Sequence, residues 1–124
     1  MKTKANNLFD EAIEKLNEAS EELFRPEEDV VTYAICKNAQ FAIENYLKGF
    51  LLNNDVDPSN YKTIESLYNQ CKMINVKFEE IDISSFACKS YEIDSRYCNE
   101  VSKVSNCFDI ADNLDTFFRR EKII

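Results

Sequence analysis

The 124-residue chain contains no histidine and no tryptophan, and it has only one glycine and two prolines. Without histidine, it lacks the side chain that most often moves protons near neutral pH. All-β sandwiches and barrels need many tight turns, and the low content of glycine and proline therefore favours helices. No apolar run is long enough to span a membrane and no signal peptide is recognisable, so we expect a cytoplasmic protein without membrane contact.

The cysteines also give no sign of a metal site. There are five, an odd number, and no two of them form a Cys-x-x-Cys pair: Cys36, Cys71, Cys88, Cys98 and Cys107. Zinc sites use clustered cysteine and histidine ligands, and this chain has no histidine to add. We therefore expect free thiols in a reducing compartment and no metal or other cofactor.

The net charge of −8 opposes a broad nucleic-acid-binding face, because phosphate binding depends on lysine and arginine. A small local basic patch is still compatible with this net charge. Much of the acid lies between Asp10 and Asp29. The plain interpretation is a solvated helix face, and the alternative is a docking surface for a basic partner.

Apolar residues recur at steps of three and four, which predicts amphipathic helices. The expected helices run from about Thr3 to Phe24, Pro26 to Asn53, Thr63 to Ile74 and Asn99 to Arg120. The apolar stripe of the third holds Ile64, Leu67, Cys71 and Ile74, and that of the last holds Val101, Val104, Phe108, Ala111, Leu114 and Phe118. Arg119, Arg120 and Lys122 suit the negative C-terminal end of the last helix. The stretch "NNDVDPSNYK" predicts a loop. Between Val76 and Ile93 the pattern is ambiguous, and Asp82 or Ser84 is a candidate cap for a short helix from Phe86 to Tyr91. The prediction is one all-α domain over residues 1–124, an antiparallel up-and-down bundle of four to five helices.

The second expected helix is apolar on more than one side. Its main stripe holds Ile35, Ala39, Ala42, Ile43, Tyr46, Leu47 and Phe50, and the residues that widen it are Val31, Tyr33, Phe41 and Leu51. Such a helix is central in its bundle or carries an oligomer contact, so we expect a homodimer. Gly49 inside this helix predicts a close helix crossing.

The same helix carries a family resemblance. "CKNAQFAIENYLKGFLL" resembles the second-helix signature of HEPN domains (higher eukaryotes and prokaryotes nucleotide-binding). The matching positions are Ala39, Gln40, Ala42, Glu44, Leu47 and Lys48. Downstream, "TIESLYNQC" and "DSRY" follow in the family's order, and Ser95-Arg96-Tyr97 is similar to its Ala-Arg-Tyr-like tripeptide. The resemblance covers about Asp29 to Arg120.

The resemblance implies an all-helical bundle that usually dimerises. Many such domains work beside a small nucleotidyltransferase, as a toxin–antitoxin or regulatory pair. A large subset are metal-independent ribonucleases, which use an arginine followed after four to six residues by a histidine. Counted from Arg96, that histidine belongs at Val101, Ser102 or Lys103, and none qualifies. Glu100 or Asp94 would replace it as a base only if burial raised its pKa.

Three interpretations of Arg96 stay open: an ion pair with Asp94, Glu92 or Glu44, a contact to phosphate or nucleotide, and catalysis. The spacing of four puts Gln40, Glu44 and Lys48 on one helix face, either as a surface pair or as a polar strip beside the groove that holds Arg96. The candidate ligand-binding residues are Arg96, Tyr97, Asn99, Gln40, Glu44 and Lys48, and we assign no catalytic residue.

The preferred hypothesis is a catalytically inactive HEPN-like binding module. Its partner would be a second copy, a nucleotidyltransferase-type protein or a nucleotide, with RNA also open. One alternative is a ribonuclease toxin whose non-standard site is built from Arg96, Asn99 and an acidic residue. The other alternative is an unrelated helical-bundle interaction protein.

Overall fold

The computed structural model describes residues 2–23, 32–83 and 101–124. Over these ranges the chain forms four α-helices, two 3-10 helices and no β-strand. The elements are α1 (Lys2–Leu23), α2 (Thr32–Asn53), η2 (Pro58–Asn60), α3 (Ile64–Ile74), η3 (Val76–Glu80) and α4 (Val101–Arg120). The all-α class and the helical bundle expected from the sequence are confirmed.

The predicted boundaries agree closely wherever they fall on described residues. The first helix differs from its predicted start by one residue, and η2 lies in the predicted loop. α3 begins at Ile64, one residue after its predicted start, with Thr63 as its N-cap, and it ends at Ile74 as predicted. The predicted helix starts at Pro26 and Asn99, and the short helix from 86 to 91, lie outside the described residues.

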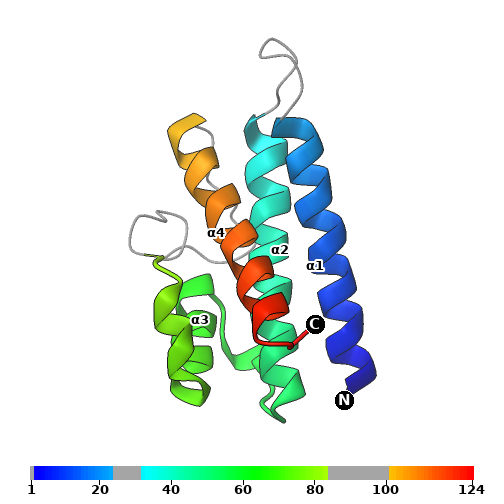
Figure 1. The fold of residues 1–124 in the computed structure, drawn as a ribbon, viewed down its shortest axis with the longest axis vertical. Coiled ribbons are helices and arrows are strands. Elements are labelled where there is room, and N and C mark those ends of the chain that lie inside the picture. Colours follow the sequence, from blue (N-terminus) through cyan, green and yellow to red (C-terminus); the bar gives the residue numbers. More distant parts are fainter. Residues whose placement is uncertain (1, 24–31, 84–100) are drawn as a thin grey trace.

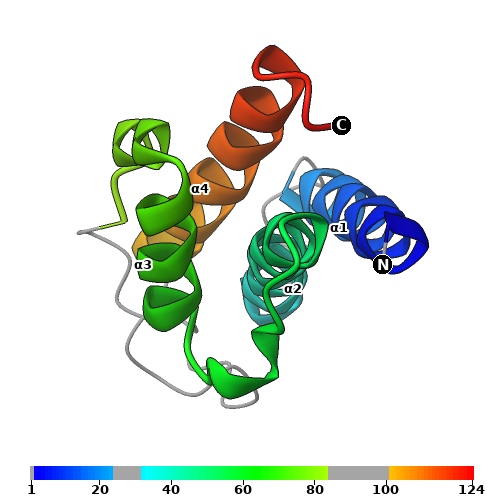
Figure 2. The same ribbon diagram turned by 90° about the horizontal axis from the view of Figure 1, so that it is seen from below.

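α2 lies at the centre of the bundle, with α1 on one side and α3 on the other (Figures 1 and 2). α1 and α2 are antiparallel, since Phe9 lies against Gly49 while Glu11 lies near Asn45. α4 packs against both and runs in the same direction as α2 (Figure 1). The C-terminal half of α2 therefore contacts all three other helices.

This central position accounts for the wide apolar surface of α2. Leu51 was expected to widen that surface toward a possible oligomer contact, but it is fully buried inside the chain. It therefore offers nothing to a second copy. Phe41 is half-buried, while the side chains of Val31 and Tyr33 lie outside the described part. For Leu51, at least, a central helix is the correct explanation.

The predicted close crossing at Gly49 is confirmed. An ideal Cβ added at Gly49 would lie 2.5 Å from Cε1 and 2.8 Å from Cδ1 of the Phe9 ring. Real Cβ atoms do not approach ring carbons so closely. The chain therefore places its only glycine in a helix interior, where the missing side chain lets α1 approach α2.

Aromatic side chains form the centre of the core around Phe118 of α4. Its ring centroid lies 5.7 Å from that of Phe9, 5.3 Å from Tyr46, 6.2 Å from Phe50 and 5.9 Å from Phe78. All four contacts are edge-on or tilted, and aromatic pairs avoid a direct face-to-face arrangement. Phe118 thus joins α1, α2 and η3 to α4.

Several core positions differ from the predicted stripes. Ile74 was expected in the buried stripe of α3, but it is 38% exposed because it is the last residue of that helix, beyond the packed turns. Phe117 and Ile110 of α4 are buried beside the predicted stripe. Phe78 is fully buried although it lies in the segment whose pattern was ambiguous.

Two helix ends use non-glycine residues in the left-handed region. Asp55 has φ 63° after α2, and Lys122 has φ 60° after α4. After α2, the amide of Val56 donates to Leu51 O at 2.9 Å and the amide of Asp55 to Leu52 O at 3.1 Å. This pair of bonds is the Schellman motif, in which glycine is the usual residue.

Candidate functional site

The polar strip of α2, defined as Gln40, Glu44 and Lys48, is more buried than a solvent-facing row. Gln40 is 2% exposed and Glu44 is 8% exposed. Lys48 Nζ lies 2.8 Å from Glu44 Oε1, so the ion pair indicated by the spacing is present. The idea of a simple surface pair is wrong for Glu44, because neighbouring helices cover α2 on several sides.

The other candidate residues lie outside the described ranges. Arg96, Tyr97 and Asn99 fall within residues 84–100, as do Asp94 and Glu92. Whether Arg96 is paired with carboxylates, and whether it lines a groove between α2 and α4, both stay predictions. The structure therefore brings together the three α2 candidates and leaves their relation to the arginine motif untested.

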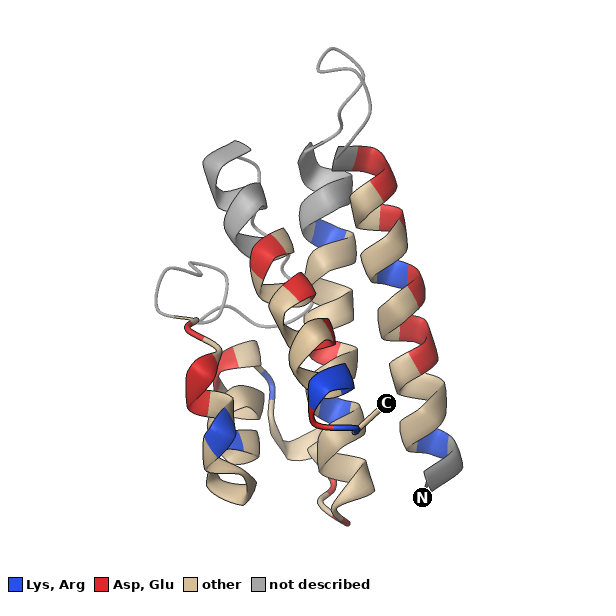
Figure 3. Ribbon diagram, in the orientation of Figure 1, with Lys and Arg blue, Asp and Glu red and all other residues tan. Residues whose placement is uncertain are grey.

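A hollow of about 680 Å³ lies between α1 and α2, and we call it the α1–α2 groove. Its lining residues are Glu11, Glu14, Lys15, Glu18, Lys37, Asn38, Phe41, Glu44 and Asn45. Glu44 therefore belongs both to the polar strip and to this groove. Figure 3 shows carboxylates along much of α1, and the first of them in the sequence is Asp10.

The groove arises because α1 and α2 pack closely through small residues. Ala5, Ala12 and Ala19 of α1 are fully buried, and so are Ala39 and Ala42 of α2. Spacings of seven residues on α1 keep its alanines on one face. Beside this apolar seam, the longer polar side chains of both helices form the walls of the groove.

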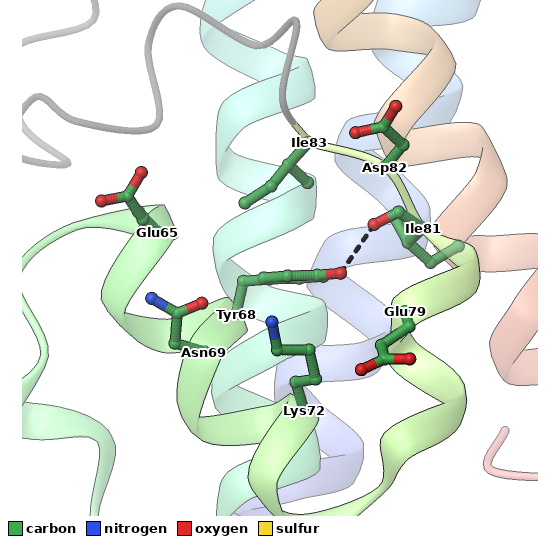
Figure 4. Close-up of a pocket in the computed structure, with 8 residues that line it drawn as sticks. All are labelled: Glu65, Tyr68, Asn69, Lys72, Glu79, Ile81, Asp82 and Ile83. Carbon is green, nitrogen blue, oxygen red and sulfur yellow. Dashed lines mark hydrogen bonds between the residues drawn. The ribbon is translucent and has the colours of Figure 1, made fainter.

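A second hollow, of about 610 Å³, lies between α3 and the segment that follows it (Figure 4). Tyr68 lies in its wall, with its hydroxyl 2.9 Å from Phe78 O and 2.8 Å from Ile81 O. Burial is the main cause that raises the pKa of Tyr68. These bonds tie η3 to α3, so the tyrosine has a structural role. Tyr68 lies four residues after Ile64, and this spacing indicated a buried position that the predicted stripe of α3 left out.

A partly buried polar contact joins α2 to α4. The Tyr46 hydroxyl donates to Asp115 Oδ1 at 2.5 Å, and Arg119 Nε donates to Asp115 Oδ2 at 2.8 Å. Burial, and then the bond to this carboxylate, raise the pKa of Tyr46 well above its ordinary value. A tyrosine held neutral in this way is a poor proton acceptor, and the contact fastens the core.

The basic end of α4 is also occupied by ion pairs. Arg120 contacts Glu80 and also lies 3.4 Å from Glu121, whose carboxylate is 2.9 Å from Lys77 Nζ. Lys77 is the main cause that lowers the pKa of Glu121. The predicted role of basic residues at this helix end therefore includes links to η3 and to the chain terminus. These arginines do not form an unpaired basic patch.

Other classes of site find no support in the part of the chain that the structure describes. No group of three or more histidine, cysteine, aspartate and glutamate side chains there is arranged to hold a metal ion. Burial raises the pKa of the Cys71 thiol, which disfavours the reactive thiolate. None of the described helices combines the length and the apolar character that a bilayer crossing requires.

A family model described as HEPN domain matches residues 5–120. The match includes all of α2, α3 and α4 and most of α1. No curated protein and no solved structure matches the chain.

Proposed function

The chain belongs to the HEPN domain family, and from this premise we propose that it is a catalytically inactive helical binding module. The observation that carries the proposal is the absence of histidine from the whole sequence. Histidine is the only side chain whose ordinary pKa places its charge change near neutral pH. At the spacing used by the ribonucleases that the chain resembles, Arg96 is followed by Val101, Ser102 and Lys103. The module would thus bind its partner without cleaving RNA.

Two kinds of partner fit this proposal: a nucleotidyltransferase-type protein, as in the pairs that the resemblance implies, or a nucleotide. For a nucleotide, Arg96 is the proposed phosphate contact, because its guanidinium presents paired donors. Tyr97 and Asn99 are proposed beside it, with the polar strip of α2 at the edge of the site. The carboxylate-rich α1–α2 groove does not suit a phosphate, so a nucleotide site would share with it at most the edge at Glu44.

A thermal melt distinguishes the roles proposed for Arg96. A nucleoside triphosphate that binds the folded chain should raise the melting temperature of the wild type. Arg96→Ala should abolish this rise, while Arg119→Ala, which removes an exposed arginine of α4, should retain it. A lower melting temperature for Arg96→Ala, without any nucleotide effect on the wild type, would instead assign Arg96 a structural role. With that result, a protein partner would be the only kind of partner left in the proposal.

Dimerisation is a further part of the proposal. It is supported by the family's usual behaviour and by two exposed apolar side chains, Met73 at 79% and Val76 at 65%. Sedimentation at high micromolar concentration should give a dimer, and a monomer there would reject this part. We place the module in the cytoplasm, where a buried free thiol such as Cys71 stays reduced.

A further inference from the structure

The α1–α2 groove has an excess of negative charge. Four of its lining residues are carboxylates, Glu11, Glu14, Glu18 and Glu44, against Lys15 and Lys37. Two carboxylates already have cations, with Lys15 Nζ 3.3 Å from Glu18 Oε2 and Lys48 paired to Glu44.

Glu11 and Glu14 are exposed and take part in no ion pair with the residues that the structure describes. The contact from Asn45 Nδ2 to Glu11 Oε2 is 3.5 Å long, beyond the usual range of a hydrogen bond. Two carboxylates in one wall therefore remain available to a cation from outside.

The opposite wall supplies an apolar and an amide surface. Asn38, Phe41 and Asn45 follow one another on α2 at steps of three and four, so they share one face of that helix. Phe41 is half-buried and lines the groove. An aromatic ring beside carboxylates suits a guanidinium, which pairs with the carboxylates and stacks on the ring.

The dimensions suit a peptide segment. Glu11 and Glu18 are seven residues apart on α1, which corresponds to a length of about 10 Å along the helix axis. That length matches about two turns of a second helix. A metal ion would need a tight ligand cluster, which the described residues do not contain, and the phosphates of RNA would be repelled by the carboxylates.

We propose that the α1–α2 groove docks a basic segment of a protein partner. Arginine or lysine side chains of that segment pair with Glu11 and Glu14, and an apolar side chain or a guanidinium packs on Phe41. This inference rests on the proposed function, since a binding module needs a partner. It selects a protein with a cationic face as the occupant of this surface.

The test uses a fluorescein-labelled helical peptide that carries three arginines and one leucine on one face, and its binding is followed by fluorescence anisotropy. In Glu11→Gln/Glu14→Gln, affinity should fall about five-fold, as expected for two exposed ion pairs. The matched control is Asp10→Asn/Glu21→Gln. This control changes the net charge equally, at exposed positions of the same helix, but leaves the groove lining intact, and it should bind like the wild type.

A second pair of measurements separates docking from general attraction. Phe41→Ala should lower the affinity for the peptide, while the circular dichroism spectrum of the variant stays that of a folded helical protein. The affinity of the wild type for the peptide should also fall as the salt concentration rises. Equal losses in both carboxylate pairs, or no binding by the wild type, would overturn the proposal. So would displacement of the peptide by single-stranded RNA. RNA cleavage by the wild type would instead overturn the proposed function, whatever the peptide result.

Discussion

Replacing Gly49 by alanine should destabilise the protein, although alanine is the better helix former. In an unconstrained helix interior the change would stabilise by about 1 kcal/mol. Here the added Cβ would lie 2.5 Å from a Phe9 ring carbon. That ring is 3% exposed and packs edge-on against Phe118 with centroids 5.7 Å apart, so it has little room to withdraw.

The magnitude follows from two opposing terms. Overpacking a filled core costs about 1–3 kcal/mol. With the propensity gain of about 1 kcal/mol subtracted, Gly49→Ala should lower the free energy of unfolding by about 1 kcal/mol. If the Phe9 ring is the obstacle, Phe9→Leu should make room for the new Cβ. The double variant Phe9→Leu/Gly49→Ala should then be more stable, by about 1 kcal/mol, than the sum of the two single changes predicts.

Urea unfolding followed by circular dichroism measures all four members of this cycle. Asn17→Ala, at an exposed position in the interior of α1, serves as the control for helix propensity, and it should be neutral or slightly stabilising. A Gly49→Ala variant more stable than the wild type would refute the close crossing. If the losses of Gly49→Ala and Phe9→Leu simply add in the double variant, the Phe9 ring is not the obstacle.

Three further changes test individual contacts. Tyr46→Phe should cost about 1–2 kcal/mol, since Asp115 loses a buried donor. Because folding raises the pKa of Tyr46, the contribution of this hydroxyl to stability is complete below the unfolded pKa of about 10 and declines at higher pH. In urea titrations at alkaline pH, the unfolding free energy of Tyr46→Phe should therefore fall less steeply with pH than that of the wild type. Thr63→Ala should lower the melting temperature, with a loss of about 1 kcal/mol from its capping box with Ser66; an unchanged value would discount the box. Asp55→Gly should stabilise by about 0.5 kcal/mol, because glycine adopts positive φ freely; destabilisation in urea would contradict this.

Local rules were enough to predict most of the fold. Periodicity located the helices, and turn residues located the loop before α3. Gly49 was correctly interpreted as a crossing because a glycine inside an apolar helix needs a packing reason. Phe78 was not predictable in this way, since a single buried ring in a polar 3-10 segment has no period. Its burial depends on the rings of α2 and α4, which only the tertiary structure brings together.

The candidate site was predictable only in part. The spacing of Glu44 and Lys48 was enough to predict their ion pair. The burial of Glu44 was not, because it depends on which helices cover α2. The α1–α2 groove was equally hidden, since its walls come from residues that lie far apart in the sequence. The early acidic run gave a hint, and its plain interpretation as a solvated face describes exposed residues such as Asp10 and Glu21.

The central claim is that this HEPN domain does not cut RNA, and the most direct measurement is a cleavage assay on the purified protein. A fluorescently labelled single-stranded RNA is incubated at neutral pH with a chelator, beside Arg96→Ala as the matched variant. We predict that the RNA stays intact with both proteins, because no histidine is present to move the proton. Robust cleavage by the wild type that disappears in Arg96→Ala would contradict the account and identify a ribonuclease with a non-standard active site.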